Sequence, residues 1–145
     1  MFDEVRKYEQ KGHFFFKANE SLSIKCNAPS DKSGVYIIFS LKNGKIELIY
    51  VGQSGKLQAD GSMFIRKAGL GGIKDIIVNG HQFGKIPRRI SWPKQMAIEK
   101  IEGLDIYWYV THNENYCDDP SNVEKSILKT YIQIYGRLPI WNNEV

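Results

Sequence analysis

The sequence predicts a single small α/β domain of the α+β type, in which a three-stranded antiparallel sheet is flanked by helices. The chain has 145 residues, and 42% of them are hydrophobic, which is enough for one core. Two runs of β-branched and aromatic residues flank an Asn-Gly pair, as in a β-hairpin, and a third such run follows later. Amphipathic segments bounded by proline and glycine indicate helices packed on this sheet.

Composition and charge narrow the classes of protein that the chain can represent. The net charge is +4 and the isoelectric point is near 9.0, which suits a polyanionic partner, although ordinary surface lysines explain it equally well. Cys26 and Cys117 lie far apart and outside any zinc-binding motif. The charged N-terminus does not resemble a signal peptide, and no apolar run is long enough to span a membrane. We therefore expect a cytoplasmic protein with reduced thiols and no membrane partner.

The first part of the chain leads into a hairpin. We expect a short helix over residues 2–10 and an extended segment over 14–24, so that residues 1–33 form an N-terminal extension of the domain 1–145. A turn-rich segment then enters a strand over 35–41, and Asn43-Gly44 connects it to a returning strand over 45–51.

The length of the turn decides which residues of the hairpin face each other. A two-residue loop pairs Tyr36 with Val51 and places Tyr36 and Tyr50 on opposite faces, whereas a three-residue loop over 42–44 places the two tyrosines opposite each other. Hydrophobic patterning favours the two-residue loop. A site shared by both tyrosines favours the three-residue loop or a bulge elsewhere in the hairpin. We expect the three-residue loop.

Glycine and proline delimit the remaining elements. A helix is expected from Met63 through Arg66 until the glycines at 69–72, and a shorter one over 73–79 with Gly80 as its cap. A further helix is expected from about Ser91 to 102, a third strand over 104–111, and a last helix from Asp119-Pro120 to Tyr135 with Gly136 after it.

Two short motifs in the hairpin resemble a known signature. Gly34-Val35-Tyr36 and Tyr50-Val51-Gly52 are similar to the two elements that define the GIY-YIG endonuclease superfamily, and the similarity extends over residues 34–142. This family continues with an arginine on the next helix, a glutamate on a later helix and often an asparagine near the end. The resemblance implies a GIY-YIG-like nuclease fold, a DNA-cleaving activity, and five catalytic residues: Tyr36, Tyr50, Arg66, Glu124 and Asn142.

Phosphodiester hydrolysis needs an activated water, stabilisation of transition-state charge and help for the leaving oxygen. Mg²⁺ (or Mn²⁺) supplies part of this and binds through few carboxylates, so Glu124 is the candidate metal ligand. Alternatively, Ser121 and Glu124 form a capping box at the helix start, unless the helix begins at Asp119-Pro120 and carries Glu124 deeper.

The other four residues have expected roles beside the metal. Arg66 would hold the phosphate and stabilise its charge. One tyrosine would position or deprotonate the water, for which its pKa near 10 must be lowered by nearby cations, and the other would bind the phosphate or a metal-bound water. Asn142 either orients the site by hydrogen bonds or is a surface residue beside Trp141.

Further residues are candidates for DNA contact. A basic group around Pro87 and Trp92 either follows the DNA backbone or forms a solvated loop, and Gly52 would let the backbone approach the substrate closely. The complete predicted nucleic-acid-binding set is Gly52, Gln53, Ser54, Lys56, Lys67, Lys85, Arg88, Arg89 and Lys94. The alternative to a nuclease is a catalytically inactive nucleic-acid-binding module on the same fold. A homodimer would allow one cut per active site in each strand.

Overall fold

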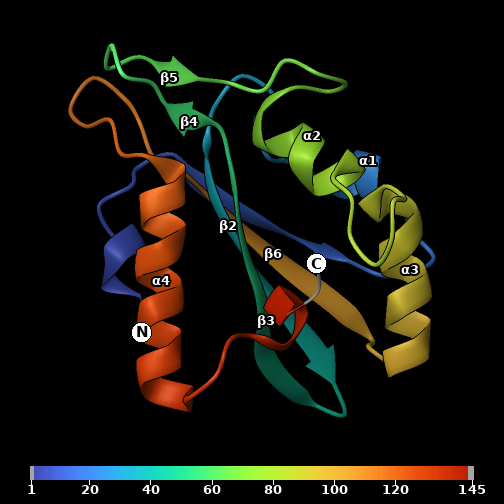
Figure 1. Cartoon of the computed structure of the whole chain (residues 1–145). Coiled ribbons are helices and arrows are strands. Elements are labelled where there is room, and N and C mark those ends of the chain that lie inside the picture. The colour runs from blue at the N-terminus through green and yellow to red at the C-terminus, as the bar shows by residue number, and fades with distance from the viewer. Residues whose placement is uncertain (1, 144–145) are drawn as a thin grey trace.

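A four-stranded antiparallel sheet forms the centre of the molecule, as a computed structural model that describes residues 2–143 shows (Figure 1). Its strand order is β1 (Lys11–Phe16), β6 (Gly103–Val110), β2 (Gly34–Lys42) and β3 (Lys45–Ser54). The mixed α+β class is therefore confirmed. The expectation of three strands is wrong, because Lys11–Phe16 forms a fourth strand that pairs with β6. Only residues 14–16 of the segment predicted to be extended over 14–24 belong to this strand, and α1 occupies its end.

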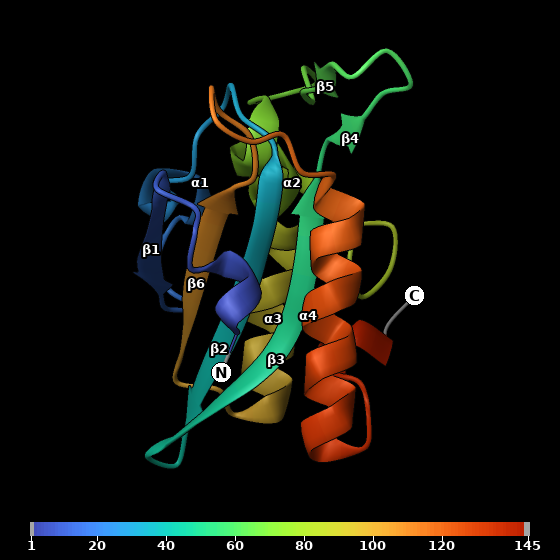
Figure 2. The same cartoon turned by 90° about the vertical axis from the view of Figure 1, so that its left-hand side faces the viewer.

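Helices cover both faces of this sheet. The short α1 (Leu22–Lys25), α2 (Gly72–Asn79) and α3 (Arg88–Glu99) pack on one face, which we call the α2/α3 face. The long α4 (Pro120–Tyr135) and the 3₁₀ turn η1 (Asp3–Val5) lie on the other, the α4 face (Figure 2). The helix expected over 2–10 is thus reduced to a single turn.

Two small elements complete the fold. A two-stranded ribbon of β4 (Lys56–Leu57) and β5 (Met63–Phe64) extends from the end of β3, and the 3₁₀ turn η2 (Ile140–Asn143) lies beside β3. No helix among residues 2–143 combines the length and the apolar character needed to cross a lipid bilayer.

The β2-β3 hairpin reaches its register in a way that the preferred prediction missed. Lys42 pairs with Lys45, and Asn43 and Gly44 both have positive φ, so the turn has two residues rather than three. The register then shifts: Ile38 is opposite Tyr50, but the next residue, Phe39, is opposite Leu48. Ile49 is therefore the extra residue of a β-bulge.

This bulge places both tyrosines on the α2/α3 face. Leu48 and Val51 belong to the core on the α4 face, whereas Ile49 and Tyr50, between them, pack on the opposite side with Tyr36. A strand without the bulge would have turned one tyrosine away from the other. Of the alternatives considered for the hairpin, a shorter loop combined with a bulge is the one that occurs.

The last helix follows its predicted signals closely. Asp119 is its N-cap and accepts a hydrogen bond from the Ser121 backbone N–H at 3.4 Å, Pro120 is its first residue, and Gly136 ends it with φ of 75°. Because the helix begins at Pro120, Glu124 is its fifth residue. The capping-box alternative for Glu124 is wrong.

Two other helix predictions also need correction. The helix expected from Met63 does not form, because β5 and an irregular loop occupy this segment and Gly69, Gly71 and Gly72 adopt positive φ. The helix expected from Ser91 starts a turn earlier, after Pro87, whose carbonyl accepts a hydrogen bond from the Ser91 N–H at 3.0 Å. The strand β6 and the helix α2 lie where the sequence predicts them.

Candidate active site

Tyr36 and Tyr50 lie side by side on the α2/α3 face of the hairpin. Their ring centroids are 6.0 Å apart and the rings are inclined by 34°. Gly52 lies directly across from Tyr36, and a β-carbon at this position would collide with both rings. A glycine is therefore required here by the packing of the tyrosine pair itself.

A buried arginine from α3 joins the two phenols. Arg88 Nη1 donates to the Tyr36 hydroxyl at 2.6 Å and Nη2 donates to the Tyr50 hydroxyl at 3.2 Å. The Arg88 side chain also reaches α2, where Nη1 donates to the Ile76 carbonyl at 2.8 Å. Only 4% of Arg88 is exposed, so the guanidinium is held almost entirely away from water.

The buried Gln82 fixes the orientation of this guanidinium. Its Oε1 accepts from Arg88 Nε at 3.1 Å and from the Trp92 indole N–H at 3.0 Å, and its Nε2 donates to the Trp141 carbonyl at 3.5 Å. The Arg88 Cζ also lies 5.4 Å from the centre of the Trp92 ring, within the range of a cation–π contact. Four hydrogen bonds and this contact leave the arginine little freedom to rotate.

Within residues 2–143, the charge of Arg88 has no acidic partner. None of the ion pairs of residues 2–143 includes it, and its side-chain acceptors are two phenols and an amide. Removing a cation from water without an anion beside it is costly, so a structure that keeps one needs a compensating interaction.

The phenol of Tyr36 stays protonated at neutral pH. Its burial raises the pKa far above the ordinary value, and Arg88 lowers it only in part, while Tyr50 and Glu124 raise it further. Arg88 alone therefore does not bring the pKa of Tyr36 down to the range of a general base. Since this hydroxyl accepts from Arg88 and keeps its own hydrogen, it is equipped to donate a hydrogen bond.

Glu124 approaches the pair from α4. Burial raises the pKa of this half-buried carboxyl, and the neighbouring Lys125 lowers it in part. Its charge acts on Tyr36, as the pKa of that phenol shows. No described residue donates a hydrogen bond to Glu124 or forms an ion pair with it, so its oxygens are free to bind a ligand.

Asn142 supports the strand that carries the site. Its Oδ1 accepts from the Val51 N–H and its Nδ2 donates to the Val51 carbonyl, both at 2.9 Å. This pairing occupies the outer edge of β3 between Tyr50 and Gly52. Asn142 is thus not a free surface residue beside Trp141, because its side chain is hydrogen-bonded to β3. These hydrogen bonds go to the backbone of Val51 and not to either phenol.

Arg66 is engaged elsewhere. It lies in the irregular loop before α2, and its Nε donates to Asp75 Oδ2 at 2.6 Å. Among the described residues, it makes no hydrogen bond to either tyrosine. The arginine that joins Tyr36 and Tyr50 is Arg88, which the sequence placed only among the DNA-binding candidates.

A readable sequence signal for Arg88 did exist. With α3 starting after Pro87, the residues Arg88, Ser91, Trp92 and Met96 fall on one helical stripe, and all four are buried. A helix start placed at Pro87 would have shown an arginine on the core side of an amphipathic helix, which is unusual for this residue type.

The other DNA-binding candidates divide by exposure. Ser54 is buried and donates to the Gly72 carbonyl at 3.3 Å, so its hydroxyl serves the fold. Gln53 is half-buried, and its Oε1 has no hydrogen-bond partner among the described residues. The basic side chains are exposed: Lys56, Lys67, Lys85, Arg89 and Lys94.

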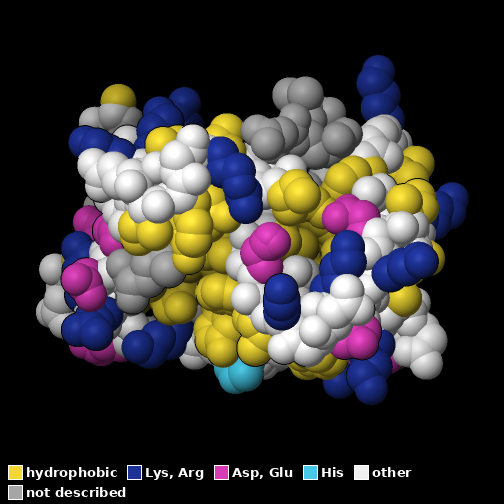
Figure 3. All heavy atoms as spheres, turned by 90° about the horizontal axis from the view of Figure 1, so that it is seen from below, with side chains coloured by type: hydrophobic (Ala, Val, Ile, Leu, Met, Phe, Trp, Pro, Cys, Tyr) yellow, Lys and Arg dark blue, Asp and Glu magenta, His cyan; other side chains and the backbone are white. Residues whose placement is uncertain are grey.

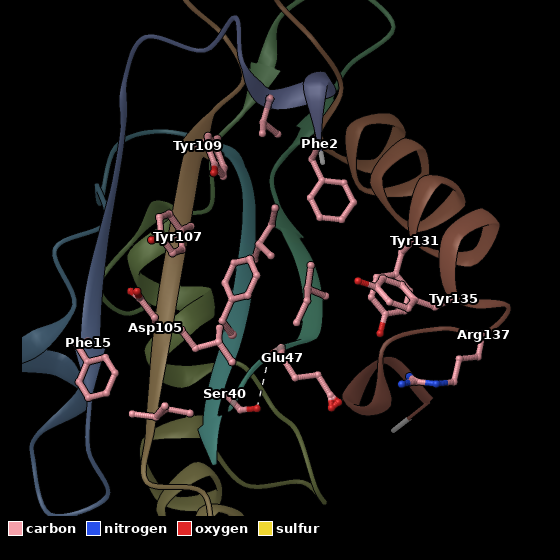
Figure 4. A pocket seen from close by; sticks show the side chains of 16 residues that line it. Phe2, Phe15, Ser40, Glu47, Asp105, Tyr107, Tyr109, Tyr131, Tyr135 and Arg137 are labelled. Carbon is pink, nitrogen blue, oxygen red and sulfur yellow. Dashed lines mark hydrogen bonds between the residues drawn. The ribbon is translucent and has the colours of Figure 1, made fainter. Parts of the chain in front are cut away.

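A separate hollow lies on the α4 face. This groove of about 760 Å³ is lined mainly by apolar and aromatic side chains, including Phe39, Tyr107, Tyr131 and Tyr135 (Figure 4). Seen from the end at which the hairpin turns, hydrophobic side chains lie across the middle of the molecule, with charged ones among and around them (Figure 3). The charged residues of its lining are Glu47, Asp105 and Arg137. The tyrosine pair lies on the other side of the sheet.

No protein-family model matches the chain, and neither a curated protein nor a solved structure matches it. Within residues 2–143, no three histidine, cysteine or acidic side chains gather in a way that could hold a metal ion together.

Proposed function

We propose that the protein is a metal-dependent endonuclease that hydrolyses phosphodiester bonds in DNA. The observation that carries this proposal is the buried Arg88, a cation without an acidic partner that is held between two phenols. A phosphodiester supplies the missing negative charge. A basic chain also attracts the polyanion to which this group belongs.

In this proposal, the cluster stabilises the charge that develops on the phosphate. Arg88 makes four hydrogen bonds, so one N–H on Nη2 remains for a phosphate oxygen. Tyr36, which keeps its proton, donates a second hydrogen bond to the phosphate. Tyr50 is less buried than Tyr36 and positions the attacking water. Donors fixed in advance in a site that excludes water are effective because they need no reorganisation during the reaction.

Glu124 would hold the divalent ion, Mg²⁺ or Mn²⁺. Its carboxylate oxygens are the hard ligands that these ions prefer, and they lack a protein partner. When bound, the ion supplies Lewis-acid stabilisation of the phosphate and the leaving oxygen. A cation beside Glu124 would also offset the burial that disfavours its charged form.

The proposal keeps most of the GIY-YIG resemblance and changes one assignment. Tyr36, Tyr50 and Glu124 retain their expected roles, and Asn142 positions β3. The phosphate-binding arginine becomes Arg88 in place of Arg66. These residues come from three layers of the fold, the sheet, α3 and α4.

A catalytically inactive nucleic-acid-binding module is the second candidate. The observation that favours it is the depth of the cluster: Tyr36 is only 1% exposed, and both phenols already accept hydrogen bonds from Arg88. A protein of this kind would bind DNA in a salt-dependent manner and leave it intact.

Incubation of supercoiled plasmid with the protein and Mg²⁺ or Mn²⁺ separates the two candidates. We expect relaxed and linear forms to appear, and the rate to fall at least about 100-fold in Glu124→Gln. Glu114→Gln, at an exposed loop position, is the matched control and should cleave like the wild type. DNA binding without cleavage would favour the inactive module, and equal cleavage by Glu124→Gln would refute the role of this carboxylate.

A further inference from the structure

Two arginines outside the tyrosine cluster are attached to the same side-chain network on α2. Arg66 Nε donates to Asp75 Oδ2 at 2.6 Å, and Arg89 Nη1 donates to Asn79 Oδ1. Asn79 Nδ2 in turn donates to Asp75 Oδ1 at 2.8 Å. The two anchor residues are one helical turn apart, about 6 Å along the helix axis. A loop before α2 and a helix after it thus supply cations to one side of the same short helix.

The carboxylate at the centre of this network is buried. Asp75 is 1% exposed, and it also accepts from the Leu70 backbone N–H at 2.8 Å. The loop approaches it so closely that a β-carbon on Gly69 would collide with its Oδ1. Hydrogen bonds from Asn79 and Arg66 hold the pKa of Asp75 below its usual value despite burial, so it stays charged at neutral pH.

Both arginines keep donors that no described residue uses. Arg66 donates only through Nε, which leaves both terminal nitrogens free, and its side chain is 36% exposed. Arg89 is exposed and donates through one nitrogen. The network fixes one side of each guanidinium and leaves the rest toward solvent, which is the arrangement that favours bidentate phosphate binding.

The same helix connects this pair to the proposed catalytic cluster. Ile76, next to Asp75, accepts a hydrogen bond from Arg88 through its carbonyl oxygen. Arg88 and Arg89 are neighbours in the first turn of α3, with one directed into the tyrosine pair and the other to Asn79. Two ordered cations, Arg66 and Arg89, are therefore attached to the same short helix as Arg88.

Basic residues are concentrated in one segment of the chain, which contains both arginines of this network. The segment 61–94 contains one acidic residue, Asp75, and seven basic ones: Arg66, Lys67, Lys74, Lys85, Arg88, Arg89 and Lys94. Since the whole chain has a net charge of only +4, the remainder is slightly acidic. The loop, α2 and the start of α3 thus form the basic part of the molecule.

We infer that Arg66 and Arg89, ordered by Asp75 and Asn79, bind the sugar-phosphate backbone of DNA next to the phosphate held at Arg88. This inference rests on the proposed nuclease function for the identity of the ligand. It gives Asp75 a positioning role: the carboxylate touches no DNA and acts by orienting the guanidinium groups that do. Arg66 is then a binding residue rather than the catalytic one of the sequence prediction.

Replacing Asp75 by asparagine tests this inference by the sign of the effect. The change removes one negative charge and so raises the net charge by one. Simple attraction therefore predicts tighter DNA binding. Loss of an ordered phosphate contact predicts binding that is weaker by about tenfold at 0.1 M salt, with a salt slope reduced by about 1. Asp105→Asn is the matched control, because Asp105 pairs with His13 between β1 and β6 and its loss adds the same charge.

Fluorescence anisotropy of a labelled 20-base-pair duplex, with the full chain in EDTA, gives these affinities. We expect Asp75→Asn to bind more weakly than the wild type and Asp105→Asn to bind equally or slightly more tightly. If Asp75→Asn binds as tightly as Asp105→Asn, the network is only structural and the inference is wrong. Far-UV circular dichroism and melting curves establish that each variant is folded.

A second set of variants keeps the test decisive if Asp75→Asn does not fold. Arg66→Gln and Arg89→Gln should each reduce the salt slope by about 1, and Lys129→Gln on the exposed side of α4 should have a smaller effect. Asn79→Ala changes no charge and should still weaken binding, unlike Asn122→Ala. Equal effects of Arg66→Gln, Arg89→Gln and Lys129→Gln would overturn the inference.

Binding in EDTA is independent of cleavage, so the two proposals can fail separately. A protein that binds through this network but never cuts plasmid supports the inference and rejects the nuclease. A protein that cuts plasmid while Asp75→Asn, Arg66→Gln and Arg89→Gln bind normally keeps the nuclease and rejects the inference.

Discussion

The two faces of the sheet bury different kinds of side chain. On the α2/α3 face, the hydrophobic core surrounds a polar centre in which Arg88 and Gln82 are almost completely buried. On the α4 face, valine, isoleucine, leucine and tyrosine side chains pack without such a centre, and an apolar groove remains open beside them. Burying polar groups costs free energy, and this cost falls mainly on the α2/α3 face.

This contrast teaches where stability and chemistry are to be sought. Apolar burial on the α4 face stabilises the fold in proportion to the area removed from water. The charged centre of the α2/α3 face is a weak source of stability, since the cost of removing the cation from water offsets much of what its hydrogen bonds contribute. We therefore expect substitutions on the two faces to separate cleavage from stability.

Arg88→Met should give the largest effect on function. We expect cleavage to fall about 100- to 1,000-fold because a fixed donor to the phosphate is lost, while the free energy of unfolding changes by less than about 2 kcal/mol. Plasmid nicking and urea denaturation measure the two quantities. The exposed Arg137→Met is the control. If Arg88→Met instead lost stability and kept its cleavage rate, the α2/α3 face would serve stability rather than cleavage, and the expected contrast would be wrong.

Ile127→Ala should show the opposite behaviour on the α4 face. Ile127 is fully buried, and its truncation should cost about 2–5 kcal/mol of unfolding free energy. The folded fraction should cleave DNA at the rate of the wild type, because this side chain faces away from Tyr36. Ile132→Ala, at an exposed position of the same helix, should change stability by less than about 0.5 kcal/mol.

Gly52→Ala should affect both quantities together. The added methyl group must displace the rings of Tyr36 and Tyr50, which should cost about 1–3 kcal/mol and reduce cleavage by separating the phenols. Gln53→Ala, one residue further along β3 and on the other face, should leave cleavage nearly unchanged. Normal activity in Gly52→Ala would show that the spacing of the phenols is not critical.

Glu124→Gln should have a small effect on stability, and the size of this effect depends on pH. Burial raises the pKa of Glu124, so the folded state resists its ionisation, and the wild type loses stability as pH rises above the ordinary value of 4.5. Without metal, we expect the glutamine variant to be more stable at pH 7 by less than about 1 kcal/mol, since the group is partly exposed. Thermal melts at pH 4 and pH 7 measure this difference, which should nearly vanish at pH 4.

Local signals in the sequence predicted the elements with clear boundaries. The pair Asn43-Gly44, the cap and proline at the start of α4, and Gly136 at its end act through neighbouring residues, and the structure has each of them in place. Tyr36 and Tyr50 share a face as the site required. The Ile49 bulge that brings this about has no local signature in the strand.

Interactions between distant segments account for what the sequence did not predict. Local residues predicted the extended conformation of 14–16, but the pairing of Lys11–Phe16 with β6 is a contact over about ninety residues. The choice between Arg66 and Arg88 depends on whether Asp75 or the phenols receive the guanidinium. Order along the chain favours Arg66, whereas folding gives it to Asp75 and brings Arg88 to the tyrosines.

The bulge at Ile49 divides the β2-β3 hairpin into two parts, and a change of length has a different consequence in each of them. Between the turn and Ile49, adding or removing two residues from each strand would keep every side chain on its face and would only change how far the hairpin projects. Deleting Ile49 itself would instead restore regular pairing and rotate Leu48 and everything before it relative to the tyrosines. The hairpin tip is therefore free to vary in length among related chains, whereas the distance from Ile49 to Gly52 is not.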